Sequence, residues 1–397
     1  MLQKEDLNYY LSSLATAMIP AVLATIKEIA ACQTSISTLD LIETKLRSIQ
    51  QTSQGVNISR VGGGNICVFE QEPYSPHAGP GSLVILVKVA NADPAMHDGA
   101  AGARASTLER SLHVHEERAG GKGIAKALMI AVLLDWLGDL SSPHRVGTVR
   151  VVFYGWSDAN IGAVDRFAAV LPVNHAFLWF MEPTNAMACP AEKGFGKLTI
   201  TFNTDGSSTA SDMAEKLSRS INERFKPSHP VYPLDPNNRL SFRFLPGAQH
   251  AVASPSSETS PPSIYVTFSH HPLAPAFKQD LTEHVNAQGK RLGVGDGLRI
   301  KTEHHFPGAL FDTRLEAFQR FIAIHRRIFF KEPYMDWHVH PSMASAVFKH
   351  HPAAPAVIYG LGDPYLVEDG QAIVSATDAS DFRDLLGAVG EEFLFKT

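Results

Sequence analysis

The sequence predicts an α/β protein: a larger domain with a mostly parallel sheet flanked by helices, and an inserted ferredoxin-like α+β domain. The first observation is a set of continuous apolar runs of strand length, at residues 82–90, 146–156 and 175–184. Such runs are typical of strands that are covered on both faces. The second is that helical patterns alternate with these runs, as in a sheet with crossover helices. The third is a change near Gly196, after which the next strand alternates polar and apolar residues.

The elements of the larger domain alternate between helices and strands. Residues 5–31 predict an amphipathic helix with a kink at Pro20, and a second helix begins with Ser37 or Thr38 as N-cap and ends near Gln51. The pattern then predicts a pair of strands within residues 55–70, the three apolar strands, and a helix at 123–137 between the first and second of these. After residue 311 it predicts a helix, a strand at 356–362 and a last helix at 379–393.

The inserted domain is predicted from shorter, more polar elements. Strands are expected at residues 197–206, 263–271 and 297–305, and amphipathic helices at 211–225 and 275–292. This succession is close to the order β-α-β-β-α-β, which gives a small antiparallel sheet with helices on one face. We therefore expect one domain formed by residues 1–196 and 311–397, and an inserted domain formed by residues 197–310.

Composition excludes several classes of function. The chain has 397 residues, a net charge of −5, 44% hydrophobic and 19% charged residues, which is ordinary for a globular protein. Lys and Arg are scattered, so we expect no nucleic-acid partner. The most apolar run, residues 127–134, is far shorter than the roughly 20 residues of a membrane span, so we expect no membrane partner. Three widely spaced cysteines fit a reducing compartment and predict a cytoplasmic protein.

Five segments, in this order, resemble the di-zinc amidase family that includes aminoacylase, acetylornithine deacetylase, succinyl-diaminopimelate desuccinylase and glutamate carboxypeptidase. SLVILVKVANADPA resembles the strand that ends in His-x-Asp, and HEERAGGKGIAKAL resembles the turn that carries the bridging Asp. VRVVFYGWSDANIGA resembles the strand that ends in Glu-Glu. FMEPTNAMACPAEKGFGKLTITF resembles the Glu-Pro-Thr segment and the hinge into the lid domain, and AAPAVIYGLG resembles the strand before the last metal ligand.

The resemblance places most of the family's metal positions on residues that cannot bind zinc. The metal-binding His falls on Val89, the bridging Asp on Gly120 and the general-base Glu on Ser157. Zinc needs imidazole, thiolate or carboxylate ligands, and its bound water is the family's nucleophile. Two acids are retained, Asp158 and the Glu of Glu-Pro-Thr, Glu182. Near Glu368, where the last ligand is expected, there is no histidine, and we predict no metal and no other cofactor.

These observations predict a metal-independent, divergent amidase-fold protein, a pseudoenzyme of its family in the sense that di-zinc hydrolysis is lost. We expect it to bind or act on a small amino-acid or peptide-like amide, either by repurposed acyl-transfer chemistry or as a non-catalytic binder. The candidate catalytic residues are Asp158 and Glu182. The candidate ligand-binding residues are Asn91, His113, His115, Glu116, Lys122 and Glu368. The substitution Glu182→Gln keeps the shape of the side chain and removes its charge, so it is expected to leave the melting temperature nearly unchanged and to abolish ligand binding or turnover. The alternative is that Glu182 caps a loop or pairs with a nearby Lys or Arg and is structural.

Two alternatives remain open at this point. The first is a metal-dependent amidohydrolase or peptidase whose ligands have moved to the His-x-His pairs at residues 113–115 and 338–340, since alternate residues of a strand point to one face. The second is a structural partner of an active homologue. The resemblance also implies a homodimer through the inserted lid domain.

Overall fold

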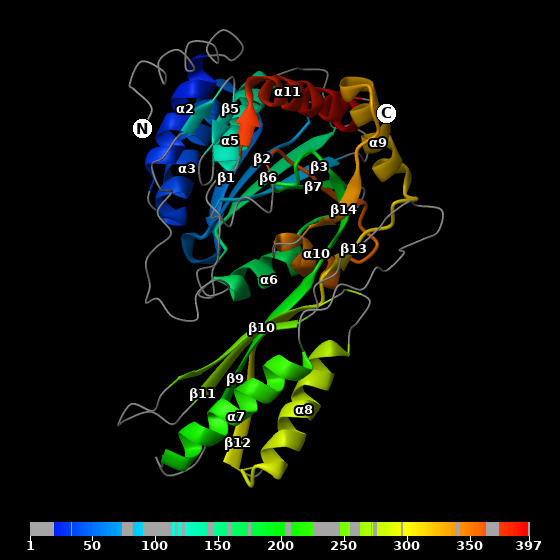
Figure 1. Ribbon diagram of the computed structural model, residues 1–397. Coiled ribbons are helices and arrows are strands. Elements are labelled where there is room, and N and C mark those ends of the chain that lie inside the picture. Colours follow the sequence, from blue (N-terminus) through cyan, green and yellow to red (C-terminus); the bar gives the residue numbers. More distant parts are fainter. Residues whose placement is uncertain are drawn as a thin grey trace. The chain divides into compact units, whose positions relative to one another are not determined.

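A computed structural model describes most of the chain (Figure 1). The described residues are 20–32, 34–73, 82–89, 113–115, 118–120, 124–140, 147–156, 160–173, 176–202, 208–225, 247–254, 263–270, 272, 276–294, 297–338, 342–362 and 373–395.

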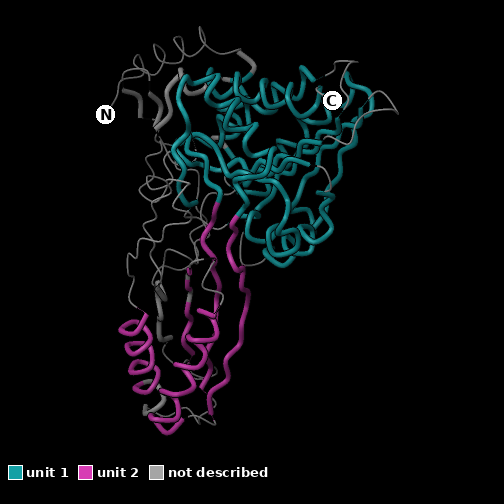
Figure 2. The backbone as a smooth tube through the Cα atoms, turned by 90° about the vertical axis from the view of Figure 1, so that its right-hand side faces the viewer, with its two compact units in different colours: residues 1–97, 101–190, 311–397 teal, residues 98–100, 191–310 magenta. Residues whose placement is uncertain are grey.

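The chain divides into two compact units (Figure 2). Unit 1 takes residues up to Pro190, apart from a short stretch at 98–100, and resumes at Phe311. Unit 2 contains Ala191–Leu310.

Unit 1 is built on a sheet whose strand order is β1-β2-β6-β3-β7-β15-β8, with β14 paired to β8; the last strand of this sheet, β13, belongs to the residues of unit 2 and pairs with the end of β8. The central strands β6, β3, β7 and β15 run parallel, whereas β1, β2 and β8 join antiparallel at the sides. The strands are β1 Val56–Val61, β2 Ile66–Gln71, β3 Ser82–Lys88, β6 Thr148–Tyr154, β7 Ala176–Met181, β8 Ala188–Glu192, β13 Ala309–Leu310, β14 Met335–His338 and β15 Ala356–Ile358. A separate small sheet, in the order β16-β5-β4, joins β16 Ile373–Ser375, β5 Arg118–Gly120 and β4 His113–His115.

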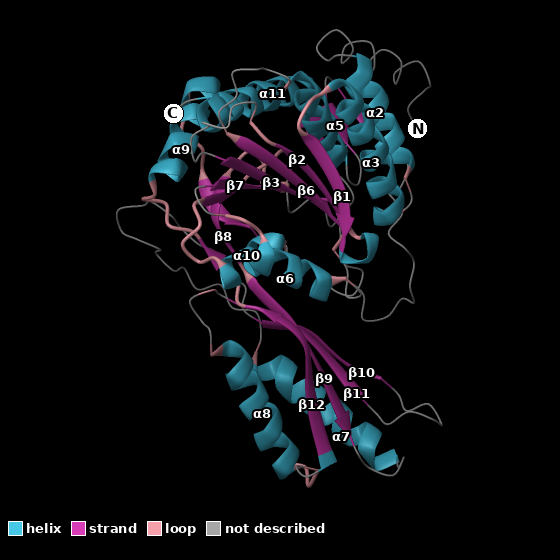
Figure 3. Ribbon diagram, turned by 180° about the vertical axis from the view of Figure 1, so that it is seen from behind, coloured by secondary structure: helices cyan, strands magenta, loops and turns pink. Residues whose placement is uncertain are grey.

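Helices cover both faces of the large sheet (Figure 3). On one face lie α2, α3, α5, α9 and α11, and on the other α6 and α10. Helix α5 is apolar around almost its whole circumference, as expected for a helix buried between other helices and a sheet. The helices are α2 Pro20–Ala31, α3 Ser35–Thr52, α5 Ile124–Asp139, α6 Ile161–Val170, α9 Glu316–Phe329, α10 Met343–His350 and α11 Ala376–Gly390, with a 3₁₀ turn at Gly62–Gly64 and a π turn at Glu391–Phe395.

Unit 2 contains a four-stranded antiparallel sheet in the order β10-β11-β9-β12. Its elements follow the chain order β-α-β-β-α-β, and this strand order is that of a ferredoxin-like sheet. Two helices pack on one face over a core that includes Leu198, Ile200 and Val266. The elements are β9 Gly194–Phe202, α7 Ser208–Arg224, β10 Gly247–Ser254, β11 Ser263–His270, α8 Phe277–Arg291 and β12 Leu298–Phe306.

The predicted fold class is confirmed, and the differences lie at element ends and in elements that were not predicted, among them strand β10 and helix α10. Helix α3 begins earlier than predicted, because Thr34 is its N-cap and Ser37 is the third helical residue that completes a capping box. Helix α2 is described from Pro20 onward, and the part of the predicted helix before Pro20, on which the expected kink depends, lies outside the described residues. Within the described residues, no helix is long and apolar enough to cross a membrane.

Candidate functional site

Three polar side chains form a row where neighbouring central strands of unit 1 end. Lys88 is the last residue of β3 and pairs in register with Tyr154, the last residue of β6. On the other side, Val87 pairs with Met181 of β7, so that the next residue, Glu182, continues the same row. The carboxyl ends of parallel strands are where open α/β sheets bind ligands. The register of three strands therefore places an ammonium, a phenol and a carboxylate together at the edge where a ligand is expected.

Glu182 is the centre of this group, and both of its carboxylate oxygens have partners. Its side chain is buried, with 1% of the residue exposed. The Tyr154 hydroxyl donates to Oε1 over 3.1 Å, and the Lys126 ammonium lies 3.1 Å from Oε2. Tyr154 in turn accepts a hydrogen bond of 3.0 Å from the backbone N–H of Met343, at the start of α10. These contacts tie strand β7 to helix α5, strand β6 and helix α10.

The charge of Glu182 is set by a balance between burial and two lysines. Burial raises the pKa of the carboxyl, but the Lys126 and Lys88 ammonium groups, with smaller contributions from His338 and the hydrogen bond of Lys126, together lower it by more, so that the pKa lies below its ordinary value. Lys88 is itself buried, and its Nζ lies 5.7 Å from the centre of the Trp156 ring. A cation over an indole face is stabilised by the ring's electrons. The carboxyl group is therefore ionised at neutral pH.

The backbone after Glu182 is held tightly against the end of β15. The Thr184 hydroxyl accepts a hydrogen bond of 3.0 Å from the Gly360 N–H, and the Ala186 N–H donates to the Gly360 carbonyl over 3.0 Å. Asn185 and Ala186 adopt φ values of 53° and 57°, in the left-handed region that non-glycine residues seldom occupy. Consecutive residues in that conformation cost free energy, which the surrounding hydrogen bonds offset.

Of the candidate catalytic and ligand-binding residues named from the sequence, the structure describes the side chain of Glu182 alone. Of the alternative His-x-His metal pair at residues 338–340, His338 is described: it is buried at the end of β14, whereas His340 lies outside the described residues. His113 and His115 lie in strand β4, whose partner is β5, with His113 opposite Gly120 and His115 opposite Arg118. The other candidates lie outside the described residues, and their roles stay predictions: Asn91, Glu116, Lys122, Asp158 and Glu368.

Sequence reasoning missed the partners of Glu182. Lys88 and Lys126 each stand alone in an otherwise apolar run, SLVILVKVA and GIAKALMIAVLL. A charge in a run that must be buried needs a partner, because lysine is almost never fully buried without one. That signal, applied to Glu182 after the apolar strand HAFLWF, predicts the ion pair. The hydrogen bond from Tyr154 has no such signal, because it depends on the register between strands.

The described residues do not fit the di-metal centre that the resemblance implies. Glu182 Oε2 faces the Lys126 ammonium group, and Glu182 Oε1 accepts a hydrogen bond from the Tyr154 hydroxyl. A metal would have to replace one of these partners. Among the residues that the structure describes, no three or more His, Cys, Asp or Glu side chains are grouped so as to hold a metal ion. The positions of Val89 and Gly120 provide no donor side chain at all.

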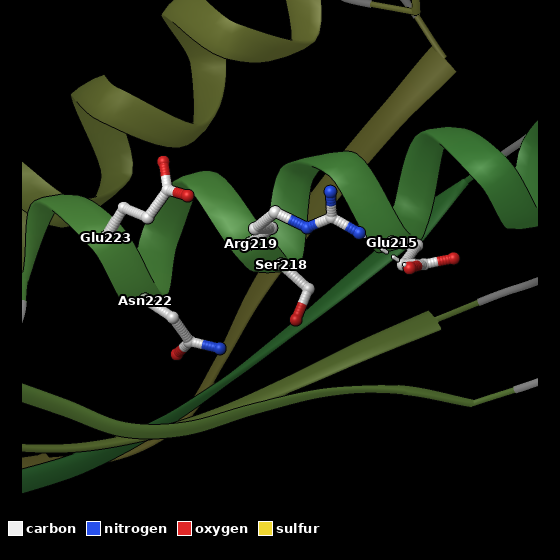
Figure 4. A pocket seen from close by; sticks show the side chains of 5 residues that line it. All are labelled: Glu215, Ser218, Arg219, Asn222 and Glu223. Carbon is white, nitrogen blue, oxygen red and sulfur yellow. Dashed lines mark hydrogen bonds and ion pairs between the residues drawn. The ribbon is translucent and has the colours of Figure 1, made fainter.

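A hollow lies on the surface of helix α7 in unit 2. It is lined by Glu215, Ser218, Arg219, Asn222 and Glu223 (Figure 4). All five belong to one helix, and Arg219 is paired with Glu215 at 2.9 Å while both side chains remain two-thirds exposed. Exposed pairs of this kind contribute little free energy. It is therefore a surface hollow between helical side chains, and the group around Glu182 is the better candidate site.

Comparison with solved structures relates the fold to a group of peptidases. No protein-family model matches the sequence, and no curated protein matches it. The chain is similar to the di-peptidase Dug1p from Saccharomyces cerevisiae, with a TM-score of 0.66, 12% identity and 98% of each chain covered. It is also similar to human carnosine dipeptidase 1, with a TM-score of 0.61, 10% identity and 99% of each chain covered.

A third similar structure is the M20 family metallo-carboxypeptidase Sso-CP2 from Sulfolobus solfataricus, with a TM-score of 0.61 and 11% identity, covering 94% of this chain and 98% of that one. Identities this low establish the shared fold and leave the activity open. The chain has the amidase and peptidase fold that the five sequence segments resemble, over almost its whole length.

Proposed function

We propose that the protein is a metal-independent, divergent member of the amidase fold that binds a small amino-acid or peptide-like amide beside Glu182. The observation that carries this proposal is the pairing of Glu182 with Lys126 at 3.1 Å, in the position that the resemblance gives to a metal-binding carboxylate. The carboxylate is already neutralised by an ammonium group, so a divalent cation would have to displace it or lie against it.

The chemistry of the group favours binding over proton transfer. A general base works best when its pKa lies near the operating pH, whereas the two lysines hold the pKa of Glu182 below its ordinary value. A fixed ammonium, a carboxylate and a phenol are instead suited to the amine, carboxylate and amide groups of an amino-acid derivative. Of the two versions of the prediction, repurposed catalysis and non-catalytic binding, the described residues support binding.

The fold supports a small amide as the ligand. The similar proteins are a di-peptidase, a carnosine dipeptidase and a metallo-carboxypeptidase by their descriptions. We therefore propose dipeptides and N-acyl amino acids as the ligand class to test. A homodimer through unit 2 and a cytoplasmic location remain expectations, and light scattering of the purified chain tests the first.

Calorimetric titration of the full chain with N-acyl amino acids and dipeptides, in the presence of a chelator, tests the proposal. We expect at least one compound to bind, with a Kd that changes by less than about twofold when zinc replaces the chelator. The double variant K126M/E182Q removes both charges together and should weaken binding by about tenfold or more. Variant K349M, which removes the exposed pair with Asp165, is the matched control and should bind normally. Binding that occurs only with zinc, or that survives unchanged in the double variant, contradicts the proposal.

A further inference from the structure

The short loop at residues 330–334, between helix α9 and strand β14, exposes two aromatic side chains (Figure 1). Phe330 is 92% exposed and Tyr334 is 80% exposed, the two highest values among the large hydrophobic residues that the structure describes. Each aromatic side chain carries a large apolar surface, and aromatic residues are enriched where proteins bind one another. The loop therefore presents apolar surface that packing within the chain does not use.

The loop is held in place from both sides, so its aromatic residues have a defined position. The Lys331 carbonyl oxygen lies 3.2 Å from Nδ1 of the buried His325. Pro333 is buried, and the Tyr334 carbonyl oxygen accepts a hydrogen bond of 2.9 Å from the Ala188 N–H of β8. A surface that is ordered before binding loses less conformational freedom when a partner binds.

Phe330 has a backbone conformation that costs free energy. It directly follows the last residue of α9, and its φ of 55° and ψ of 20° lie in the left-handed region, where helix ends usually have glycine. A bulky residue in this region is an outlier, and such strained residues cluster at functional sites. Packing does not explain the strain, because the side chain lies almost entirely in water. A role in binding accounts for both the strain and the exposure.

The charges around the loop indicate the chemistry of the partner. Residues 326–334 contain three exposed cations, Arg326, Arg327 and Lys331, and one acid, Glu332, which pairs with Arg326. The whole chain has a net charge of −5, so this basic surface is a local exception, and charge complementarity favours an acidic partner. A lipid surface fits less well. Two aromatic residues and this small net charge provide less than one fatty-acyl chain, which by itself binds membranes only marginally.

We propose that residues 330–334, together with Arg327, form a docking surface for an acidic segment of another protein. Phe330 is the anchor and packs between apolar side chains of that segment, while carboxylates of the segment pair with Arg327 and Lys331. The inference goes beyond the proposed function, because none of these residues belongs to the group around Glu182.

Selection from a phage-displayed library of random peptides, with the full chain as the target, tests this inference. The Kd of each selected peptide is then measured by fluorescence anisotropy. We expect a group of peptides that combine Asp or Glu with apolar residues and that bind the variant F330G at least about tenfold more weakly than the wild type. The variant R327Q/K331Q should weaken the same peptides by about threefold or more, with the larger effect at low salt.

Two controls separate the loss of binding from a loss of folding. Glycine adopts the left-handed conformation without strain, so F330G should keep the Tm of the wild type or raise it by about 1–3 °C. F330N is a second variant for the same test, because asparagine tolerates this conformation. V170S replaces another exposed apolar residue, at the end of α6, and should bind the peptides normally.

Three results overturn the inference. The first is that no peptide is selected, or that the selected peptides bind F330G and F330N as tightly as the wild type. The second is that the peptides that depend on Phe330 carry no excess of acidic residues. The third is Phe330-dependent binding of the chain to vesicles of phosphatidylserine and phosphatidylcholine, which would assign the loop to a membrane surface.

Discussion

At the scale of single residues, His325 provides a pH-dependent contribution to stability that is separate from the site. It is buried, its Nδ1 lies 3.2 Å from the Lys331 carbonyl oxygen, and its ring stacks on Phe329 and meets Tyr359 edge-on. Burial, only partly opposed by the hydrogen bond to Lys331, lowers the pKa of His325 to about 4. Nε2 has no hydrogen-bond partner among the described residues, so a second ring proton would be buried without an acceptor.

The sign of the effect follows from that lowered pKa. The unfolded chain takes up the proton near the ordinary value of 6.5 and the folded chain only near 4, so acid favours unfolding over that interval. We expect stability to be full above pH ~6.5 and to fall by about 3 kcal/mol as the pH drops to 4. The variant H325F should flatten this part of the curve, as measured by urea unfolding at several pH values. H350Q, at a partly exposed histidine, is the control, and an equal slope in wild type and H325F would exclude the effect.

The expected effect of replacing Glu182 changes once its partners in the structure are known. From the sequence, a role in the site predicts that Glu182→Gln leaves folding nearly unchanged, because glutamine keeps the shape of the side chain, whereas a pair with a Lys or Arg predicts a structural role. In the structure this change would leave Lys126 and Lys88 buried without their carboxylate. Breaking a buried pair from one side costs about 3–5 kcal/mol, so the substitution is expected to be destabilising. The lowered pKa of Glu182 adds stability above the ordinary carboxyl value of 4.5, and this is lost at lower pH.

At the scale of elements, the contact between the end of β15 and the Glu182 loop allows no extra atom. A Cβ at Gly360 would lie 2.4 Å from the Glu182 carbonyl oxygen and 2.6 Å from Met129 Sδ. We expect Gly360→Ala to push β15 away from this loop and to lower the free energy of unfolding by about 1–3 kcal/mol. Gly387→Ala is the matched control, because nothing lies within 4 Å of its Cβ and it sits inside helix α11. It should be neutral or stabilising by up to about 1 kcal/mol, and similar urea midpoints for the two variants would refute the packing argument.

Continuous apolar strands were predictable from the sequence, whereas strand β10 and the short strands β8 and β14 were not. The strands β3, β6 and β7 are continuous apolar runs, which is the pattern of strands buried on both faces. By contrast, β8 and β14 are short, and they contain Pro190 and Asp336, respectively, which are unusual in strands. Their pairing therefore depends on contacts with residues distant in sequence. The site divides in the same way. Glu182 was identified from the Glu-Pro-Thr segment of the resemblance and from its position after a strand, whereas its hydrogen bond from Tyr154 depends on the register of β6 and was not predictable.

At the scale of the whole molecule, the chain retains a fold in which other proteins hydrolyse peptides, although only 12% of residues are identical to the di-peptidase Dug1p. Core positions conserve the fold when they remain apolar and of suitable size, so sequence identity can fall this far without a change of architecture. Catalysis has no such tolerance, because it needs specific donor atoms at specific positions. In the described site, the Lys126 ammonium is paired with the Glu182 carboxylate, which di-metal chemistry would need as a ligand for a metal ion.

The rate of amino-acid release from N-acyl amino acids and dipeptides, with added zinc or cobalt and with chelator, tests the central claim most directly. We predict no metal-dependent release above the uncatalysed rate. The loss of the general base alone typically costs 10²–10⁴-fold, and the absence of metal activation of water adds to it. Robust release with zinc or cobalt that a chelator abolishes would contradict the account and would establish a working metallohydrolase.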